Sequence, residues 1–206
     1  MCKKIGFSNK PVLEGSKVIL RPFIEADCEI MLGLLEEPEL RKLTGSVCSD
    51  EEADEPSPQE EIDRTRQWYL TRNQQTNRLD LAIVEKESGN VVGEVVFNDY
   101  DEDTGNVNFR ILIGKAGCNR GIGSEAVSLF IHYGMTVLKV HKIGLEVYSF
   151  NPRAERVYQK AGFVLEGVKR EDFRYNDEYI DTRIYGLLQA DYKEHIKHIE
   201  SSYETL

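Results

Sequence analysis

The most informative part of this sequence is residues 146–163, which read EVYSFNPRAERVYQKAGF. An apolar strand is expected over 143–150, followed by a helix over 152–160 that begins with proline in its first turn. Proline suits that position because the amide hydrogen it lacks would have no partner there. Gly162 stands where helices commonly end, and another strand is expected over 163–168. The stretch therefore predicts a strand–helix–strand unit.

The elements around this unit mix strands and helices. Further strands are expected over 17–22, 79–85, 91–97, 107–113 and 179–188, and further helices over 24–35, 58–76, 123–138 and 189–203. Turn sequences at 88–90 and 101–106 separate three consecutive strands, which predicts an antiparallel meander. The chain shows no internal repeat and no linker between domains. We therefore expect one α/β or α+β domain over residues 1–206.

The composition is that of a soluble globular protein, with 40% hydrophobic and 30% charged residues among 206. No apolar run approaches the roughly 18 residues of a membrane span, and the start lacks a signal-peptide core, so we expect a cytoplasmic protein. The four cysteines form no C-x-x-C pair, which argues against a disulfide framework or a structural zinc site. The net charge of −10 repels nucleic acid and anionic lipid, so neither nucleic acid nor a membrane is an expected partner.

Residues 44–60 are rich in acidic side chains, contain two prolines and show no apolar periodicity. This pattern predicts an exposed acidic loop. Two interpretations stay open, of which the first is favoured. The loop is a solvated connection without a further role, or it is a lip that faces a cationic ligand.

A glycine-rich loop over 114–123 follows the strand that ends at Ile113 and leads into a helix. Glycines let the backbone approach a ligand closely, and the first turn of a helix offers free amide groups with a partial positive charge. This order is typical of a pyrophosphate site, although a tight turn that needs glycine only for its dihedral angles has the same sequence. The loop lacks G-x-x-x-x-G-K-[ST], which excludes a P-loop.

Two nucleotide ligands remain for this loop. Gly121-x-Gly123-x-x-Ala126, with Glu146 placed 20 residues beyond Ala126, matches the dinucleotide fingerprint. However, Glu146 is expected in mid-strand, and too few residues follow to complete a doubly wound domain. The other ligand is coenzyme A, whose pyrophosphate suits the same loop.

Two motifs resemble the signatures of the GNAT superfamily of acyl-CoA-dependent N-acetyltransferases. Residues 151–163 match Asn-x-x-Ala-x-x-x-Tyr-x-x-x-Gly-Phe, and the loop 118–123 is similar to [Gln/Arg]-x-x-Gly-x-[Gly/Ala], although it opens with Cys118. Leu20-Arg21-Pro22 and Val92-Gly93-Glu94 further resemble the RimJ/RimL-type branch. The resemblance covers about residues 16–193.

The resemblance implies a GNAT fold, in which helices flank a central mixed, mostly antiparallel sheet. This sheet splays between its fourth and fifth strands, here the strand ending at Ile113 and the one starting at Ile143. Acetyl-CoA is the implied co-substrate, and no metal is implied. The residues that the resemblance assigns to it are Ile111, Leu112, Ile113, Asn119, Arg120, Gly121, Ile122, Gly123, Ser124, Asn151 and Arg156.

The resemblance also gives roles to two candidate catalytic residues. Tyr158 matches the tyrosine that protonates the departing thiolate, a transfer between groups with pKa values of about 8.5 and about 10. Without the resemblance, a core tyrosine on a helix stripe is the simpler interpretation. Glu146 matches a glutamate used as general base in some members, and its apolar strand predicts a carboxylate that is either buried or faces a cleft. Glu94, Asp99 and water relays compete for that role.

The acceptor implied by the resemblance is a primary amine, either a small cationic molecule such as a polyamine or a protein N-terminus. An α-amino group has a pKa near 7.7–8.0, against about 10.4 for lysine, and so needs less help from a base. Two alternatives stay open: a non-catalytic acyl-CoA-binding module with the same fold, and, more distantly, a dinucleotide oxidoreductase. The resemblance is compatible with a homodimer.

Overall fold

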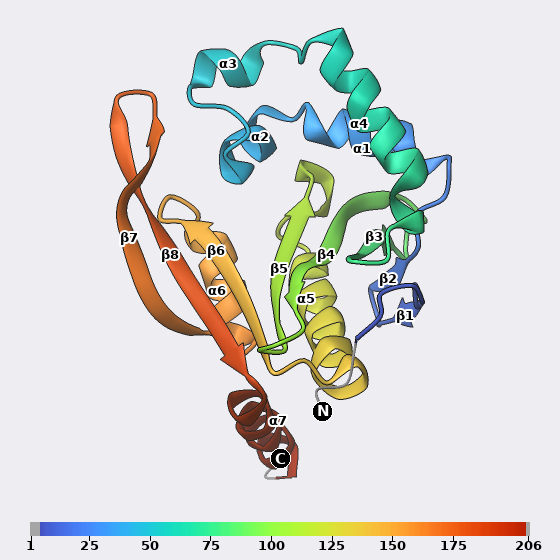
Figure 1. Cartoon of the computed structure of the whole chain (residues 1–206), viewed down its shortest axis with the longest axis vertical. Coiled ribbons are helices and arrows are strands. Elements are labelled where there is room, and N and C mark those ends of the chain that lie inside the picture. Colours follow the sequence, from blue (N-terminus) through green and yellow to red (C-terminus); the bar gives the residue numbers. More distant parts are fainter. Residues whose placement is uncertain (1–4, 205–206) are drawn as a thin grey trace.

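The computed structural model describes residues 5–204 and contains one sheet of eight strands in the order β1-β2-β3-β4-β5-β6-β8-β7 (Figure 1). The strands are β1 (Leu13–Glu14), β2 (Val18–Arg21), β3 (Leu79–Glu85), β4 (Val91–Asp101), β5 (Asn106–Ile113), β6 (Lys142–Tyr148), β7 (Val164–Tyr175) and β8 (Glu178–Leu188). The α-helices are α1 (Asp27–Leu35), α2 (Pro38–Thr44), α3 (Asp50–Asp54), α4 (Gln59–Thr71), α5 (Ile122–Tyr133), α6 (Pro152–Lys160) and α7 (Gln189–Glu204). Short 3-10 turns η1 (Arg72–Gln74) and η2 (Lys115–Gly117) and a π-helical turn η3 (Gly134–Leu138) complete the structure.

The sheet opens between β5 and β6, which are the only parallel neighbours among the described strands. Their pairing covers Asn106–Asn108 of β5 and Lys142–Gly144 of β6, and the two strands diverge beyond it (Figure 1). All other neighbouring strands pair antiparallel. The prediction of a mixed, mostly antiparallel sheet that splays between the strand ending at Ile113 and the strand from Ile143 is confirmed. The two-residue strand β1 was not predicted, so the gap follows the fifth strand of the structure.

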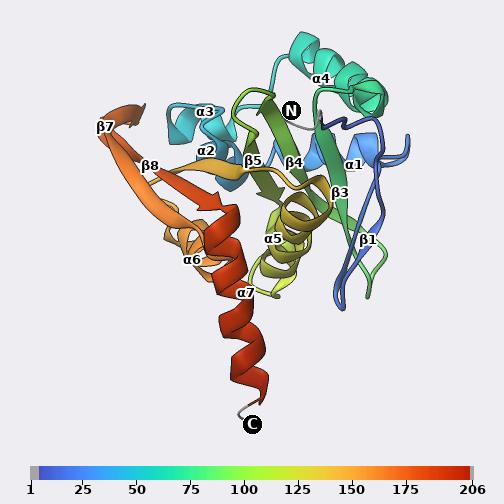
Figure 2. The ribbon, with the colours of Figure 1, turned by 60° about the horizontal axis from the view of Figure 1, so that its bottom comes forward.

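Helices cover both faces of the sheet. Figure 2 shows α1 to α4 on one side and α5, α6 and α7 on the other. The core under α5 contains the rings of Phe97 and Phe130, stacked with centroids 4.1 Å apart. A second core holds Met31 of α1 and Tyr69 of α4 against β3 and β4. No helix in the described part of the chain combines the length and the apolar character that crossing a bilayer needs.

The prediction of an acidic loop over 44–60 is partly wrong, because this segment contains helix α3. Ser49 caps this helix, and its hydroxyl accepts a hydrogen bond from the amide of Glu52 at 3.1 Å. Helix α2 was also not predicted, although Pro38 stands in its first turn and Gly45 ends it in the left-handed region at φ 69°. Both helices are too short to show a periodicity in the sequence.

Two other elements differ from expectation. The strand expected over 163–168 continues to Tyr175 as β7. The prediction was too short because β7 is a solvent-exposed outer strand, and its charged residues show no apolar alternation. The helix expected over 123–138 changes to a π-helical turn at Gly134. A Cβ at Gly134 would lie 2.8 Å from the ring of Phe97, so glycine is needed for this close packing. The expected C-terminal helix is present as α7.

Candidate active site

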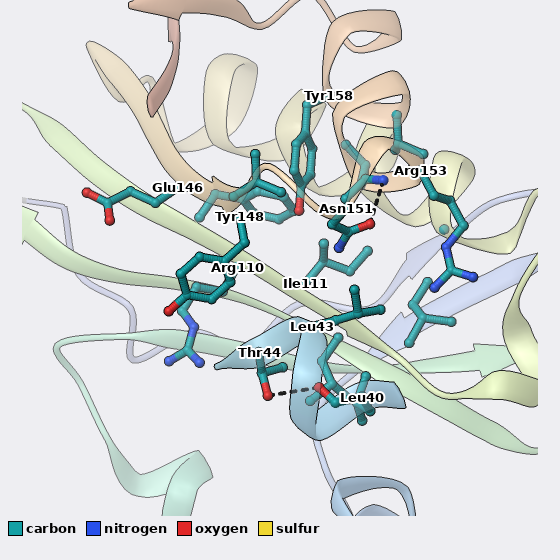
Figure 3. Close-up of a pocket in the computed structure, with 18 of the residues that line it drawn as sticks. Leu40, Leu43, Thr44, Arg110, Ile111, Glu146, Tyr148, Asn151, Arg153 and Tyr158 are labelled. Carbon is teal, nitrogen blue, oxygen red and sulfur yellow. Dashed lines mark hydrogen bonds between the residues drawn. The ribbon is translucent and has the colours of Figure 1, made fainter. Parts of the chain in front are cut away.

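A cavity of about 660 Å³ occupies the gap between β5 and β6. Strand β5 and the start of α5 form one bank, and β6 with α6 forms the other. Figure 3 shows α2 on the opposite side of this cavity from Tyr158 and Asn151. The cavity therefore lies where the divergence of the two strands removes the sheet between them.

One bank of the cavity offers backbone groups rather than charged side chains. Beyond Asn108, β5 has no strand partner on the side of β6, and its residues Ile111 to Ile113 line the cavity. Their amide and carbonyl groups on that edge are free to pair with an extended, amide-bearing chain such as pantetheine. This edge fits the arm of coenzyme A.

The start of α5 fits an anion. Gly121 is its N-cap in the left-handed region at φ 80°, and no side chain caps the first turn, which leaves amide groups available. A Cβ at Gly121 would lie 3.0 Å from Nζ of Lys17. Asn119 also has a positive φ of 59°, and it lines the cavity together with Gly121 and Gly123. This arrangement fits the pyrophosphate of coenzyme A.

The structure brings most of the predicted cofactor residues together around the cavity. Those that line it are Ile111, Leu112, Ile113, Asn119, Gly121, Gly123, Ser124 and Asn151. Asn151 also caps α6, because its Oδ1 accepts a hydrogen bond from the amide of Ala154 at 3.1 Å (Figure 3). Its Nδ2 is thereby oriented by the cap.

Three predicted cofactor residues lie elsewhere. Ile122 is 1% exposed and packs in the core. Arg120 turns away and forms ion pairs with Glu85 at 2.6 Å and Glu87 at 3.2 Å. Arg156 is exposed on α6 and does not line the cavity, unlike its neighbour Arg153.

Tyr158 lies at the centre of the site. Its ring is 7% exposed and packs edge-on against Phe109 and Phe163 at centroid distances of 6.3 and 6.0 Å. Figure 3 shows its hydroxyl pointing into the cavity. Burial raises the pKa of Tyr158, because the phenolate would be poorly solvated there. The phenol therefore stays protonated and can act as a donor.

Glu146 lines the cavity but is exposed rather than buried. Its Oε1 accepts a hydrogen bond from Nζ of Lys169 at 2.6 Å, and Figure 3 shows its carboxylate pointing away from Tyr158. The other two carboxylates considered for the base also line the cavity. Glu94 accepts a hydrogen bond from the hydroxyl of Tyr69 at 2.8 Å, whereas Asp99 is exposed.

Several lining residues were missed by sequence reasoning. They are Leu40, Leu43 and Thr44 of α2, Asn108 and Arg110 of β5, Tyr148 of β6, and Asp172 of β7. No motif marks them, because they meet only through the topology. Cys118 was noted as a departure from the signature; its Sγ lies 3.4 Å from the carbonyl of Gly114, and burial raises the pKa of its thiol. It therefore lacks the features of a reactive thiolate.

Residues 17–164 match the family model described as acetyltransferase (GNAT) domain. Over 135 residues the chain is 29% identical to spermidine N(1)-acetyltransferase from Vibrio cholerae, which covers 66% of this chain and 78% of that relative. It is 22% identical over 179 residues to the uncharacterized N-acetyltransferase YoaA from Bacillus subtilis, covering 87% of this chain and 97% of YoaA.

Solved structures show the same fold. Spermidine N-acetyltransferase from Vibrio cholerae, in complex with CoA and spermine, superposes with a TM-score of 0.73 at 23% identity, covering 86% of this chain and 99% of that one. A GCN5-related N-acetyltransferase from Brucella melitensis gives a TM-score of 0.71 at 19% identity, covering 94% and 85%. The family match extends over most of the sequence, including both banks of the cavity. The chain therefore belongs to the acetyltransferase (GNAT) domain family and is an acetyltransferase.

Proposed function

We propose that the protein transfers the acetyl group of acetyl-CoA directly to a primary amine while both are bound. The observation that carries this proposal is the buried hydroxyl of Tyr158, which points into a cavity whose opposite bank fits coenzyme A. The relatives named as spermidine acetyltransferases support a small cationic acceptor. A protein N-terminus is the second acceptor class, and we retain the RimJ/RimL-type branch and the cytoplasm as expectations.

Acetyl-CoA supplies the activated acetyl group, and the cavity residues provide its binding. We assign the pantetheine arm to the free edge of β5 at Ile111 to Ile113 and to the amide of Asn151. The pyrophosphate is assigned to the amides from Asn119 to Ser124. Arg153 is the cation that lines the cavity on α6, and we propose it in place of Arg156.

Tyr158 is proposed as the general acid. A leaving sulfur needs a proton at the moment when its bond to the acetyl carbon breaks. Because the phenol is buried and neutral, it holds its proton until negative charge develops on that sulfur. The same burial disfavours an uncompensated thiolate, so proton donation is most useful at this position.

The cavity offers carboxylates for a cation and for a base. Glu94, Asp99, Glu146 and Asp172 line it, against the guanidinium groups of Arg110 and Arg153. Two of these carboxylates are paired, Glu94 with Arg72 and Glu146 with Lys169. We retain Glu146 as the proposed general base. Since its carboxylate points away from Tyr158, it would receive the proton of the amine through water.

The decisive test is Tyr158→Phe, assayed by thiol release with a panel of amines that includes spermidine and a short peptide with a free N-terminus. The variant keeps the ring but loses the donor, so kcat should fall about 10²- to 10⁴-fold while acetyl-CoA affinity stays the same. Tyr133→Phe is the matched control, because Tyr133 is also buried but does not line the cavity. Equal kcat values for the two variants would refute the role.

A further inference from the structure

Helix α2 belongs to a segment that connects the two banks of the cavity. We call residues 38–54, which comprise α2, the turn after it and α3, the bridge. The residue just before it, Glu37, ties it to the loop after β5, because its Oε2 accepts a hydrogen bond from the amide of Lys115 at 2.7 Å. Its middle lines the cavity through Leu40, Leu43 and Thr44.

The second end of the bridge is tied to the tip of the β7–β8 hairpin, on the other bank. Asp50 accepts hydrogen bonds from the hydroxyl of Tyr175 at 2.8 Å and from Nδ2 of Asn176 at 3.0 Å. The amide of Asp50 donates to Oδ1 of Asn176 at 3.1 Å, and the amide of Asn176 donates to the carbonyl of Cys48 at 2.7 Å. We call these contacts the clasp.

An apolar seal lies beside the clasp. Val47 and Ala53 of the bridge are buried with Tyr175, against partly buried Phe150 and Phe173. The ammonium of Lys42 lies 4.3 Å from the ring centroid of Tyr175, within the range of a cation–π contact. The bridge is therefore docked on the hairpin by hydrogen bonds, apolar packing and a cation–π contact.

The bridge also contacts a side chain of the cavity wall. Gly45 is left-handed at φ 69°, and a Cβ there would lie 2.5 Å from the hydroxyl of Tyr148, which lines the cavity. The ring of Tyr148 stacks on Phe173 of the hairpin with centroids 4.5 Å apart. A movement of the bridge away from the hairpin would thus change the part of the cavity wall that Tyr148 forms, which we assign to the acceptor.

We propose that the clasp between Asp50 and Tyr175–Asn176 is a specificity device that holds the bridge across the cavity and restricts the acceptor to slender amines. This inference rests on the proposed function, and it separates the two acceptor classes left open there. A polyamine is narrow along its whole length, whereas a peptide N-terminus carries a side chain on the residue next to its amine. Asp50, Tyr175 and Asn176 act as positioning residues, since they do not line the cavity.

The test compares acceptors in the double variant Tyr175→Phe/Asn176→Gly. Asn176 has a φ of 51°, so glycine keeps the hairpin turn while the side-chain hydrogen bonds of the clasp are lost. We expect the ratio of kcat/KM for the peptide to kcat/KM for the best small amine to rise about tenfold, because three hydrogen bonds no longer favour the docked bridge. Hydrogen exchange over residues 47–54 should also become faster.

Asp177→Gly is the matched control, since Asp177 belongs to the same turn but bonds only to Arg174 among the contacts of the described residues. It should leave both the ratio and the exchange unchanged. Faster exchange with an unchanged ratio would overturn the inference, as would a wild type that uses the peptide as well as the small amine. A wild type that acetylates no amine would refute the proposed function instead. Hydrogen exchange over residues 47–54 would then still show whether the clasp holds the bridge.

Discussion

At the scale of single residues, the helix face on which a residue lies decides whether that residue of a motif reaches the site. Arg153 and Arg156 are both near Tyr158 in sequence, and the resemblance pointed to Arg156. The structure shows Arg153 at the cavity and Arg156 in solvent. Successive residues of a helix are rotated by about 100°, so a motif match predicts the helix but not the contact of each of its positions.

Gly121 carries a prediction at this scale. Gly121→Val should weaken acetyl-CoA binding about 10- to 100-fold, because a β-branched residue resists the left-handed backbone and obstructs the approach of the pyrophosphate. Isothermal titration calorimetry measures this affinity. The control is Gly89→Val, whose φ of 73° imposes similar strain at a turn with open space around it. Unchanged affinity in a folded Gly121→Val protein would contradict the assignment of this loop.

At the scale of elements, local sequence patterns located most strands and helices, and failed where distant contacts define an element. The periodic helix α5 and the strands β3 and β5 were predicted within a few residues of their bounds. Helix α3 is fixed by contacts such as the one between Asp50 and Asn176, which are 126 positions apart. No window of local sequence contains both partners, so a polar stretch looked like a loop.

Glu125 of α5 supports a prediction on pH. Burial opposes its charge, but hydrogen bonds from Ser16 and from the amides of Lys17 and Val18 lower its pKa in the folded state. A depressed pKa stabilises the fold above the ordinary value of about 4.3, and this stability is lost as the pH falls through the folded pKa. Glu125→Gln should therefore cost about 1–3 kcal/mol at neutral pH.

Urea unfolding at several pH values checks this expectation. The deficit of Glu125→Gln should shrink as the pH falls below about 4, because the wild type then loses the same charge. Glu60→Gln, which changes an exposed carboxylate on α4, should leave the free energy of unfolding nearly unchanged. A deficit of constant size from neutral to acid pH would show that the charge of Glu125 is not the cause.

At the scale of the whole molecule, the opening of the sheet is the feature that sequence periodicity did not reveal. Strand patterns predict which residues pair, but the point where β5 and β6 separate depends on everything packed around them. Only the family resemblance predicted that the sheet opens between these two strands, and the structure places the separation beyond Asn108. Neither the periodicity nor the resemblance predicted the part of the cavity lined by Leu40, Tyr148 and Asp172, because three segments that are distant in sequence form it.

Binding of acetyl-CoA should stabilise the residues around the opening of the sheet more than the rest of the molecule. At a ligand concentration of 100 Kd, the free energy of unfolding should rise by about 2.7 kcal/mol. Hydrogen exchange should slow most at the amides of residues 109–113 and 119–124, where the structure leaves backbone groups free. Protection confined to β1 and β2, or absent with a saturating ligand, would contradict the proposed placement. Gly121→Val should lose the protection around 119–124 first.

A strand edge without a partner risks pairing with another copy of the chain, and this molecule protects the outer strand β7 and the inner edge of β5 differently. The outer edge, β7, is exposed and carries the charged run Lys169-Arg170-Glu171-Asp172, which discourages the addition of a further strand. The inner edge, β5 beyond Asn108, is apolar except for Arg110, and it lies between α2 and α6. The helices on either side of this edge limit the access of a strand from another copy of the chain. We therefore expect the arrangement that forms the cavity also to limit edge-to-edge aggregation.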